Sequence, residues 1–177
     1  MFTIARIDPI DYESSDATVI EAFENQIAKN GRITNMKRTL LHSPQAFHAL
    51  MEWYPLRGAA MEFLSEREFN LFAHGISTQN NCIVCSTFFR KILIDNGDDP
   101  DKPEFTAREN VLIEFGRQCA LDPNAVSDVL FSELGALFNE KQIVILTAFA
   151  GMMIATNLIN SVLKVDLDEY LLIYTER

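Results

Sequence analysis

A long run without a charged side chain, Gln142 to Leu163 (QIVILTAFAGMMIATNLINSVL), constrains this chain more than any other feature. An uncharged run of this length could span a bilayer as a helix. Its second half, however, carries Thr156, Asn157, Asn160 and Ser161, and no Lys/Arg cluster marks a cytoplasmic flank. We therefore interpret the run as a central helix, buried in its own core or in a contact between subunits.

The rest of the chain is also predicted to be helical. Helix start and stop signals recur, and alternating strand patterns bounded by turn pairs are missing. Capping residues and capping boxes predict helices over residues 16–30, 35–42, 43–56, 65–77, 82–96, 106–119 and 128–137, ahead of the long apolar helix. The expected fold class is all-α, an oligomeric helical bundle with roughly seven to nine helices.

The domain organisation follows from length and from one linker. A chain of 177 residues is long enough for one core and short for two full domains. Residues 1–14 are expected to form an extended arm. The charged, proline-containing segment 98–103 is expected to link two half-units, neither of which is large enough for an independent core. We therefore predict a single helical domain over residues 1–177.

The charge balance and the cysteine count limit the function classes. The chain has 25 acidic and 15 basic side chains, a net charge of −10, which argues against nucleic-acid binding and against docking on anionic membranes. A secreted disulfide scaffold usually has a larger and even number of cysteines, whereas this chain has three. The N-terminal residues lack a basic segment followed by an apolar one, so the expected compartment is the cytoplasm.

The residues most indicative of chemistry are Cys82-Ile83-Val84-Cys85, at the predicted start of a helix. Free N–H groups and the positive end of the helix dipole favour a thiolate there. Two cysteines three apart can also close a disulfide after one of them is oxidised. A buried structural pair is the simpler alternative. A zinc site would need further ligands, and only Cys119 and three histidines remain, so no metal is expected.

The surrounding segments resemble the carboxymuconolactone decarboxylase and AhpD-like alkylhydroperoxidase family, and its peroxidase-related branch in particular. The resemblance is carried by SPQAF at Ser43, by LSERE at Leu64, by NNCIVC, and by FTARENVLIEFGRQCALDPNAV at Phe105. It implies an all-helical fold, a homo-oligomer (dimer, trimer or hexamer) and chemistry without a cofactor. It also implies that Cys85 attacks a hydroperoxide and that Cys82 resolves the sulfenic acid. The reductant would be a small dithiol or a partner protein. The helix-start argument alone favours Cys82 as the thiolate.

The chain departs from the family pattern at both positions of the proton relay. The expected histidine four residues after the second cysteine is Phe89, and the expected glutamate twelve residues before the first is Asn70. Neither side chain can act as a proton-transferring base. His74 lies one turn after Asn70 on the same helix face and is the candidate replacement. Its alternative is a purely structural role.

Three functions remain open at this point. The first is a thiol peroxidase in antioxidant defence. The second is a decarboxylase-like enzyme, which would need Arg and His residues converging on a cavity away from the cysteines. The third is a weakly active or non-catalytic helical oligomer that serves as a redox sensor or interaction module. Cys119 is expected in the core, and Arg90 and Lys91 are expected to be solvated.

Overall fold

The structure is a computed structural model that describes residues 5–175 of the chain. Within that range there are nine α-helices, three short 3₁₀ segments and no strand, which confirms the predicted all-α class. The α-helices are α1 (Ala17–Asn30), α2 (Asn35–Leu40), α3 (Pro44–Met51), α4 (Trp53–Ala60), α5 (Glu66–Gln79), α6 (Ile83–Asp95), α7 (Ala107–Leu121), α8 (Asp128–Leu137) and α9 (Glu140–Leu163). The 3₁₀ segments are η1 (Tyr12–Ser14), η2 (Pro123–Ala125) and η3 (Glu169–Tyr174).

Side chains at the helix starts account for most of these boundaries. Asp16 accepts a hydrogen bond from the Thr18 amide at 2.9 Å and caps α1, which ends at Gly31 in the left-handed conformation (φ 71°). Ser65 and Thr106 each form the predicted capping box, with Glu68 and Glu109 respectively. The capping signals in the sequence therefore predicted these helix starts correctly.

One predicted helix is interrupted. Residues 43–56 were expected to be continuous, but α3 ends at Met51, Glu52 separates the two helices, and α4 runs from Trp53 to Ala60. Pro55 provides the physical reason. It has no N–H to donate, and its ring clashes with the carbonyl four residues earlier, which belongs to Met51.

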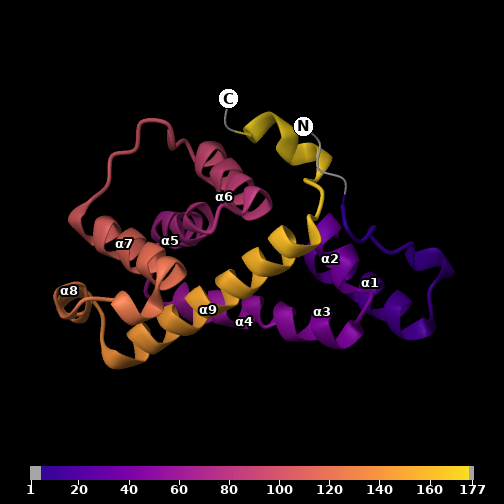
Figure 1. Ribbon diagram of the computed structural model, residues 1–177, viewed down its shortest axis with the longest axis horizontal. Helices are drawn as coiled ribbons and strands as arrows, with labels where there is room; N and C mark the ends of the chain where they lie inside the picture. Colours follow the sequence, from indigo (N-terminus) through magenta and orange to yellow (C-terminus); the bar gives the residue numbers. More distant parts are fainter. Residues whose placement is uncertain (1–4, 176–177) are drawn as a thin grey trace.

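Helix α9 runs diagonally across the molecule and organises the core (Figure 1). It contacts α3, α4, α5, α6, α7 and α8, and its Phe149 packs on Phe69 with ring centroids 4.7 Å apart. By length and composition α9 could also cross a membrane, and 39% of its most apolar window is buried inside the protein. One side of α9 therefore packs in the core, as the sequence predicts. Several of its other apolar residues, among them Val144 and Leu158, are exposed.

The arm and the linker both pack back onto the helices. In the arm, the Arg6 amide donates to the Leu163 carbonyl at 2.9 Å, and residues 1–4 lie outside the described range. In the linker, Asp101 pairs with Arg90 at 2.6 Å. Arg90 is buried, so the expectation that it is solvated is wrong. Lys91 pairs with Asp95 within the same helix.

Candidate functional site

The turn between α5 and α6 positions the cysteine pair. Asn81 adopts the left-handed conformation (φ 52°), which asparagine tolerates better than most residues, and it reverses the chain. The Cys82 amide then donates to the Ser77 carbonyl at 3.0 Å, and the Cys82 carbonyl accepts from the Ser86 amide at 2.9 Å. Cys82 is therefore the N-cap residue of α6, and Cys85 lies in its first turn.

Both cysteines are buried free thiols. The exposed fraction of Cys82 is 1% and that of Cys85 is 6%. Positions three apart on a helical turn lie on the same face, so the two sulfurs are neighbours. The pair is reduced and lies where a disulfide between its members would need only a local rearrangement.

An asparagine from the central helix completes the surroundings of the sulfurs. The Asn160 side-chain amide donates to Cys85 Sγ at 3.1 Å. The pKa of Cys82 is lowered to about 7, chiefly by the Cys85 thiol, which donates to its sulfur, while burial acts in the opposite direction. The pKa of Cys85 is raised, chiefly because its proton is held by Cys82, with burial second. When the pair loses its first proton, it shares the remaining one, and the negative charge is centred on Cys82.

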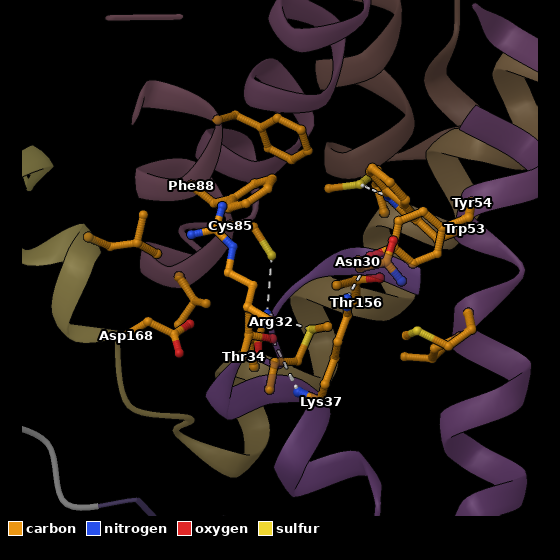
Figure 2. A pocket seen from close by; sticks show the side chains of 18 of the residues that line it. Asn30, Arg32, Thr34, Lys37, Trp53, Tyr54, Cys85, Phe88, Thr156 and Asp168 are labelled. Atoms are coloured by element: carbon orange, nitrogen blue, oxygen red, sulfur yellow. Dashed lines mark hydrogen bonds between the residues drawn. The ribbon is translucent and has the colours of Figure 1, made fainter. Parts of the chain in front are cut away.

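A cavity of about 270 Å³ opens beside Cys85 (Figure 2). Cys85 is one of its lining residues, and Cys82 is not. The apolar part of the wall comes from α4, α6, α9 and η3, with Trp53, Phe88, Phe89, Met153 and Leu171 among its members. The site therefore presents one sulfur to a small, largely apolar space and keeps the other behind it.

Another part of the wall is polar, and the sequence did not predict it. Lys37 from α2 is buried, with 8% of its surface exposed, and its ammonium donates to the Tyr54 hydroxyl at 2.6 Å. The Arg32 guanidinium lies over the Tyr170 ring, 4.4 Å from its centroid. Asp168 completes this side of the cavity. These residues come from segments distant in sequence and belong to no motif, so only the tertiary structure brings them together.

Phe89 and Asn70, which replace the two proton-relay residues of the family pattern, are both buried. Phe89 lines the cavity, and Asn70 lies in α5 with its amide nitrogen unpartnered among the described residues. His74, the candidate replacement, does not line the cavity, and its Nε2 is buried without a partner in the described part of the chain. Burial and the charges of Arg90 and Arg117 lower its pKa to about 4. The role of His74 as a base stays a prediction.

The remaining candidates lie elsewhere. Cys119 is in the hydrophobic core, as expected, and burial raises its pKa. His42 contacts the Asp8 carbonyl at 2.9 Å, and His48 is exposed on α3. Within residues 5–175 no group of three or more His, Cys, Asp or Glu side chains is arranged to hold a metal ion. No histidine lines the cavity beside Cys85.

Comparisons with known proteins agree with this architecture. No protein-family model matches the chain, and no curated protein matches its sequence. Among solved structures, the chain is similar to an alkylhydroperoxidase AhpD core, an uncharacterized peroxidase-related protein from Ralstonia eutropha JMP134. That match has a TM-score of 0.77 and 17% identity, and covers 97% of this chain and 96% of the other. An uncharacterized peroxidase-related protein from Silicibacter sp. TM1040 matches with a TM-score of 0.72 and 17% identity, over 93% of both chains.

A third similar structure has a named activity. The debrominase Bmp8 matches with a TM-score of 0.69 and 14% identity, over 95% of both chains. A cysteine-to-alanine variant of that debrominase has been solved in complex with 2,3,4-tribromopyrrole. At these identities the likeness establishes the fold alone. The chain therefore has the helical fold of the AhpD-like, peroxidase-related proteins, with its Cys82–Cys85 pair at the start of α6.

Proposed function

We propose that the protein is a thiol-dependent peroxidase, in which Cys85 reduces a hydroperoxide and Cys82 resolves the product. The observation that carries the proposal is the position of Cys85, whose side chain lines the cavity while Cys82 lies behind it. A nucleophilic thiol must meet its substrate, and only Cys85 borders a space that a small hydroperoxide could enter. Asn160 supports a thiolate at that position through its hydrogen bond to Cys85 Sγ.

Cys82 takes the part of the base in this scheme. In the ionised pair it carries the negative charge and accepts the Cys85 proton, which leaves a thiolate on the cavity side. The Cys85 sulfur attacks the terminal peroxide oxygen and the O–O bond breaks. Cys85 becomes a sulfenic acid, and the alkoxide takes the proton from Cys82 to leave as the alcohol. The chemistry then needs neither a histidine at position 89 nor a glutamate at position 70.

The second half of the cycle forms the disulfide. The Cys82 thiolate attacks the sulfenic sulfur of Cys85, an S–S bond forms, and hydroxide leaves and is protonated to water. An external dithiol, either a small molecule or a partner protein, then reduces the disulfide by thiol–disulfide exchange. We propose the cytoplasm as the compartment, because this cycle needs a steady supply of reductant.

The test is peroxide consumption under turnover. The protein is mixed with cumene hydroperoxide and dihydrolipoamide, and peroxide loss is followed for the wild type, Cys85→Ser, Cys82→Ser and Cys119→Ser. We expect turnover in the wild type and Cys119→Ser, and none in Cys85→Ser. Turnover that survives in Cys85→Ser would contradict the proposed role of that cysteine.

A redox sensor or interaction module is the second candidate, and the burial of both sulfurs favours it. A buried pair is slow to meet a large reductant, so a disulfide could form once and persist. The same assay separates the two functions. A sensor would consume about one equivalent of peroxide as its disulfide forms and then stop, whatever dithiol is supplied.

Removal of bromine from an aromatic ring is a third candidate, favoured by the aromatic wall of the cavity. Trp53, Phe88 and Phe89 line the space beside Cys85, and the structurally similar debrominase acts through the same fold. Incubation of the reduced protein with 2,3,4-tribromopyrrole, followed by measurement of bromide, tests it. Bromide release that depends on Cys85 would support this candidate over peroxide reduction if the peroxide assay is negative.

We also propose that the protein is a homo-oligomer. Helices α8 and α9 expose large apolar side chains that the subunit itself does not cover, namely Val129, Phe131, Val144, Leu158 and Val162. Exposed apolar surface of this kind is typical of contacts between subunits. Analytical ultracentrifugation tests the proposal, and a monomer at micromolar concentration would contradict it.

A further inference from the structure

The polar wall of the cavity carries more positive than negative charge. Lys37 and Arg32 both line it, on a chain whose net charge is −10. Neither cation forms an ion pair with a carboxylate among residues 5–175. The ammonium of Lys37 has only the neutral hydroxyl of Tyr54 as its hydrogen-bond partner among the described residues, although Lys37 is buried. A buried ammonium without a bonded counter-ion favours the binding of an anion.

The single carboxylate of the cavity does not neutralise this charge. One oxygen of Asp168 accepts the Asn35 amide at 2.9 Å and so helps to hold the start of α2. Asp168 lies within electrostatic range of three cations, Arg32, Lys37 and Arg38, and burial opposes its own ionisation. The net charge of the side chains around the polar wall is therefore positive.

Unpartnered polar groups strengthen the case for a ligand. The Tyr170 hydroxyl is buried and has no hydrogen-bond partner in the described part of the chain, and Tyr170 lines the cavity. The side-chain oxygen of Asn160, whose amide nitrogen donates to Cys85, is likewise without a partner there. Buried polar groups are nearly always paired in native proteins, so a ligand that pairs with the Tyr170 hydroxyl would remove the cost of leaving it unpaired.

The polar and the apolar side chains line one small space. In Figure 2 the Lys37 side chain extends from α2 toward Tyr54, and Cys85 approaches from α6. Trp53, Phe88 and Met153 supply the apolar part of the wall between these elements. The volume of about 270 Å³ suits a small organic molecule rather than a peptide.

We propose that this cavity binds small amphipathic carboxylates, with the carboxylate at Lys37 and Arg32 and the apolar body against Trp53 and Phe88. This inference rests on the proposed function in one respect. If Cys85 reduces hydroperoxides, then its preferred substrates are hydroperoxides of organic acids. The binding part of the inference stands whether or not the protein turns over.

Trp53 provides a direct test of binding, because it is the single tryptophan of the chain and lines the cavity. Its fluorescence is titrated with octanoate and with 1-octanol, which share an apolar body and differ in charge. We expect octanoate to bind about tenfold more tightly or better, the effect of one charge-assisted hydrogen bond. Equal affinities for the two ligands would overturn the inference.

Variants connect the preference to the two cations. Lys37→Met should abolish the preference for octanoate, and Arg32→Gln, at an exposed position that tolerates change, should reduce it. Lys141→Met is the matched control, since Lys141 is exposed at the start of α9 and outside the cavity. It should keep the full preference. Retention of the preference in both Lys37→Met and Arg32→Gln would contradict the proposed carboxylate site.

A peroxide pair separates this inference from the proposed function. The values of kcat/KM are compared for para-carboxycumene hydroperoxide and cumene hydroperoxide, and we expect the acid to be preferred by about tenfold in the wild type only. If neither peroxide is consumed but octanoate binding depends on Lys37, the peroxidase proposal fails and the carboxylate site stands. If both are consumed equally and octanoate has no advantage, the carboxylate site fails and the peroxidase stands.

Discussion

Asn160 and Cys85 are joined by a hydrogen bond of 3.1 Å between residues 75 positions apart in the chain. The bond ties the central helix α9 to the first turn of α6. It also directs an N–H donor at the sulfur that borders the cavity. A donor to sulfur favours the thiolate over the thiol, so α9 contributes to the chemistry of the site as well as to the core.

Loss of that donor should slow the reaction of Cys85 without unfolding the protein. For Asn160→Leu we expect the rate of Cys85 oxidation by hydroperoxide to fall about tenfold, because one hydrogen bond to a charged sulfur is lost. Single-turnover kinetics measure it. Asn157→Leu is the matched control, because Asn157 is an equally buried amide on the same helix whose side-chain oxygen accepts from the Ser77 hydroxyl and not from a cysteine. Equal rates in the two variants would contradict the assigned role of Asn160.

The pH dependence of thiol reactivity should follow the shared proton of the pair. The pKa of Cys82 is lowered to about 7, so below about pH 7 the pair gains a second proton and loses its charge. We expect the rate of oxidation to rise about tenfold per pH unit up to about pH 7 and then to level off. In Cys82→Ala only burial and Asn160 act on Cys85, so the midpoint should move upward. A midpoint unchanged in that variant would show that Cys82 does not hold the proton.

Stability should rise with pH where His74 titrates. Its pKa is about 4 in the folded protein and about 6.5 when unfolded, so the unfolded chain binds the extra proton between those values. The free energy of unfolding should therefore increase by about 2 kcal/mol from about pH 5 to about pH 7 on this account alone. His74→Gln should remove that increment and His48→Gln, on an exposed position, should retain it. Urea unfolding at the two pH values measures both, and an unchanged slope in His74→Gln would contradict the burial of the neutral ring.

Gly116 sets the close approach of α5 and α7. A Cβ at this position would lie 2.8 Å from Phe72 ring carbons and 2.9 Å from Ile76 Cγ1, both on buried side chains. Gly116→Ala should therefore destabilise the protein by about 1–3 kcal/mol. Gly135→Ala, in α8 with open space around it, should stabilise it by about 0.5–1 kcal/mol. Thermal unfolding of the pair tests the assignment, and equal shifts would contradict it.

Helix boundaries were predictable where a side chain of the same segment sets them. Asp16, Ser65 and Thr106 each bond to amides two or three residues ahead, so local sequence is sufficient. The 3₁₀ segment Glu169–Tyr174 was not predicted, because it is short and its buried Leu171 depends on tertiary packing. The burial of Arg90 was not predicted for a similar reason. Its partner Asp101 lies in the linker, which folds back onto α6.

The candidate site likewise contains residues that the local sequence predicts and residues that only tertiary packing brings together. The position of Cys82 and Cys85 at a helix start is local, and the sequence predicted it. The donor Asn160 and the cations Lys37 and Arg32 come from other elements, and no spacing rule connects them to the cysteines. The spacing of Asn70 and His74 predicts that they share a helix face, but it does not predict which face borders the cavity. Phe89 lines the cavity and His74 does not.

The most direct test of the central claim is the mass of the oxidised protein over time. The reduced wild type, Cys82→Ser and Cys85→Ser are each exposed to one equivalent of cumene hydroperoxide and followed by intact mass spectrometry. The account predicts rapid loss of two hydrogen atoms in the wild type, a sulfenic acid that forms more slowly but persists in Cys82→Ser, and no rapid change in Cys85→Ser. Oxidation of the wild type no faster than that of a free cysteine, or a sulfenic acid trapped only in Cys85→Ser, would contradict it.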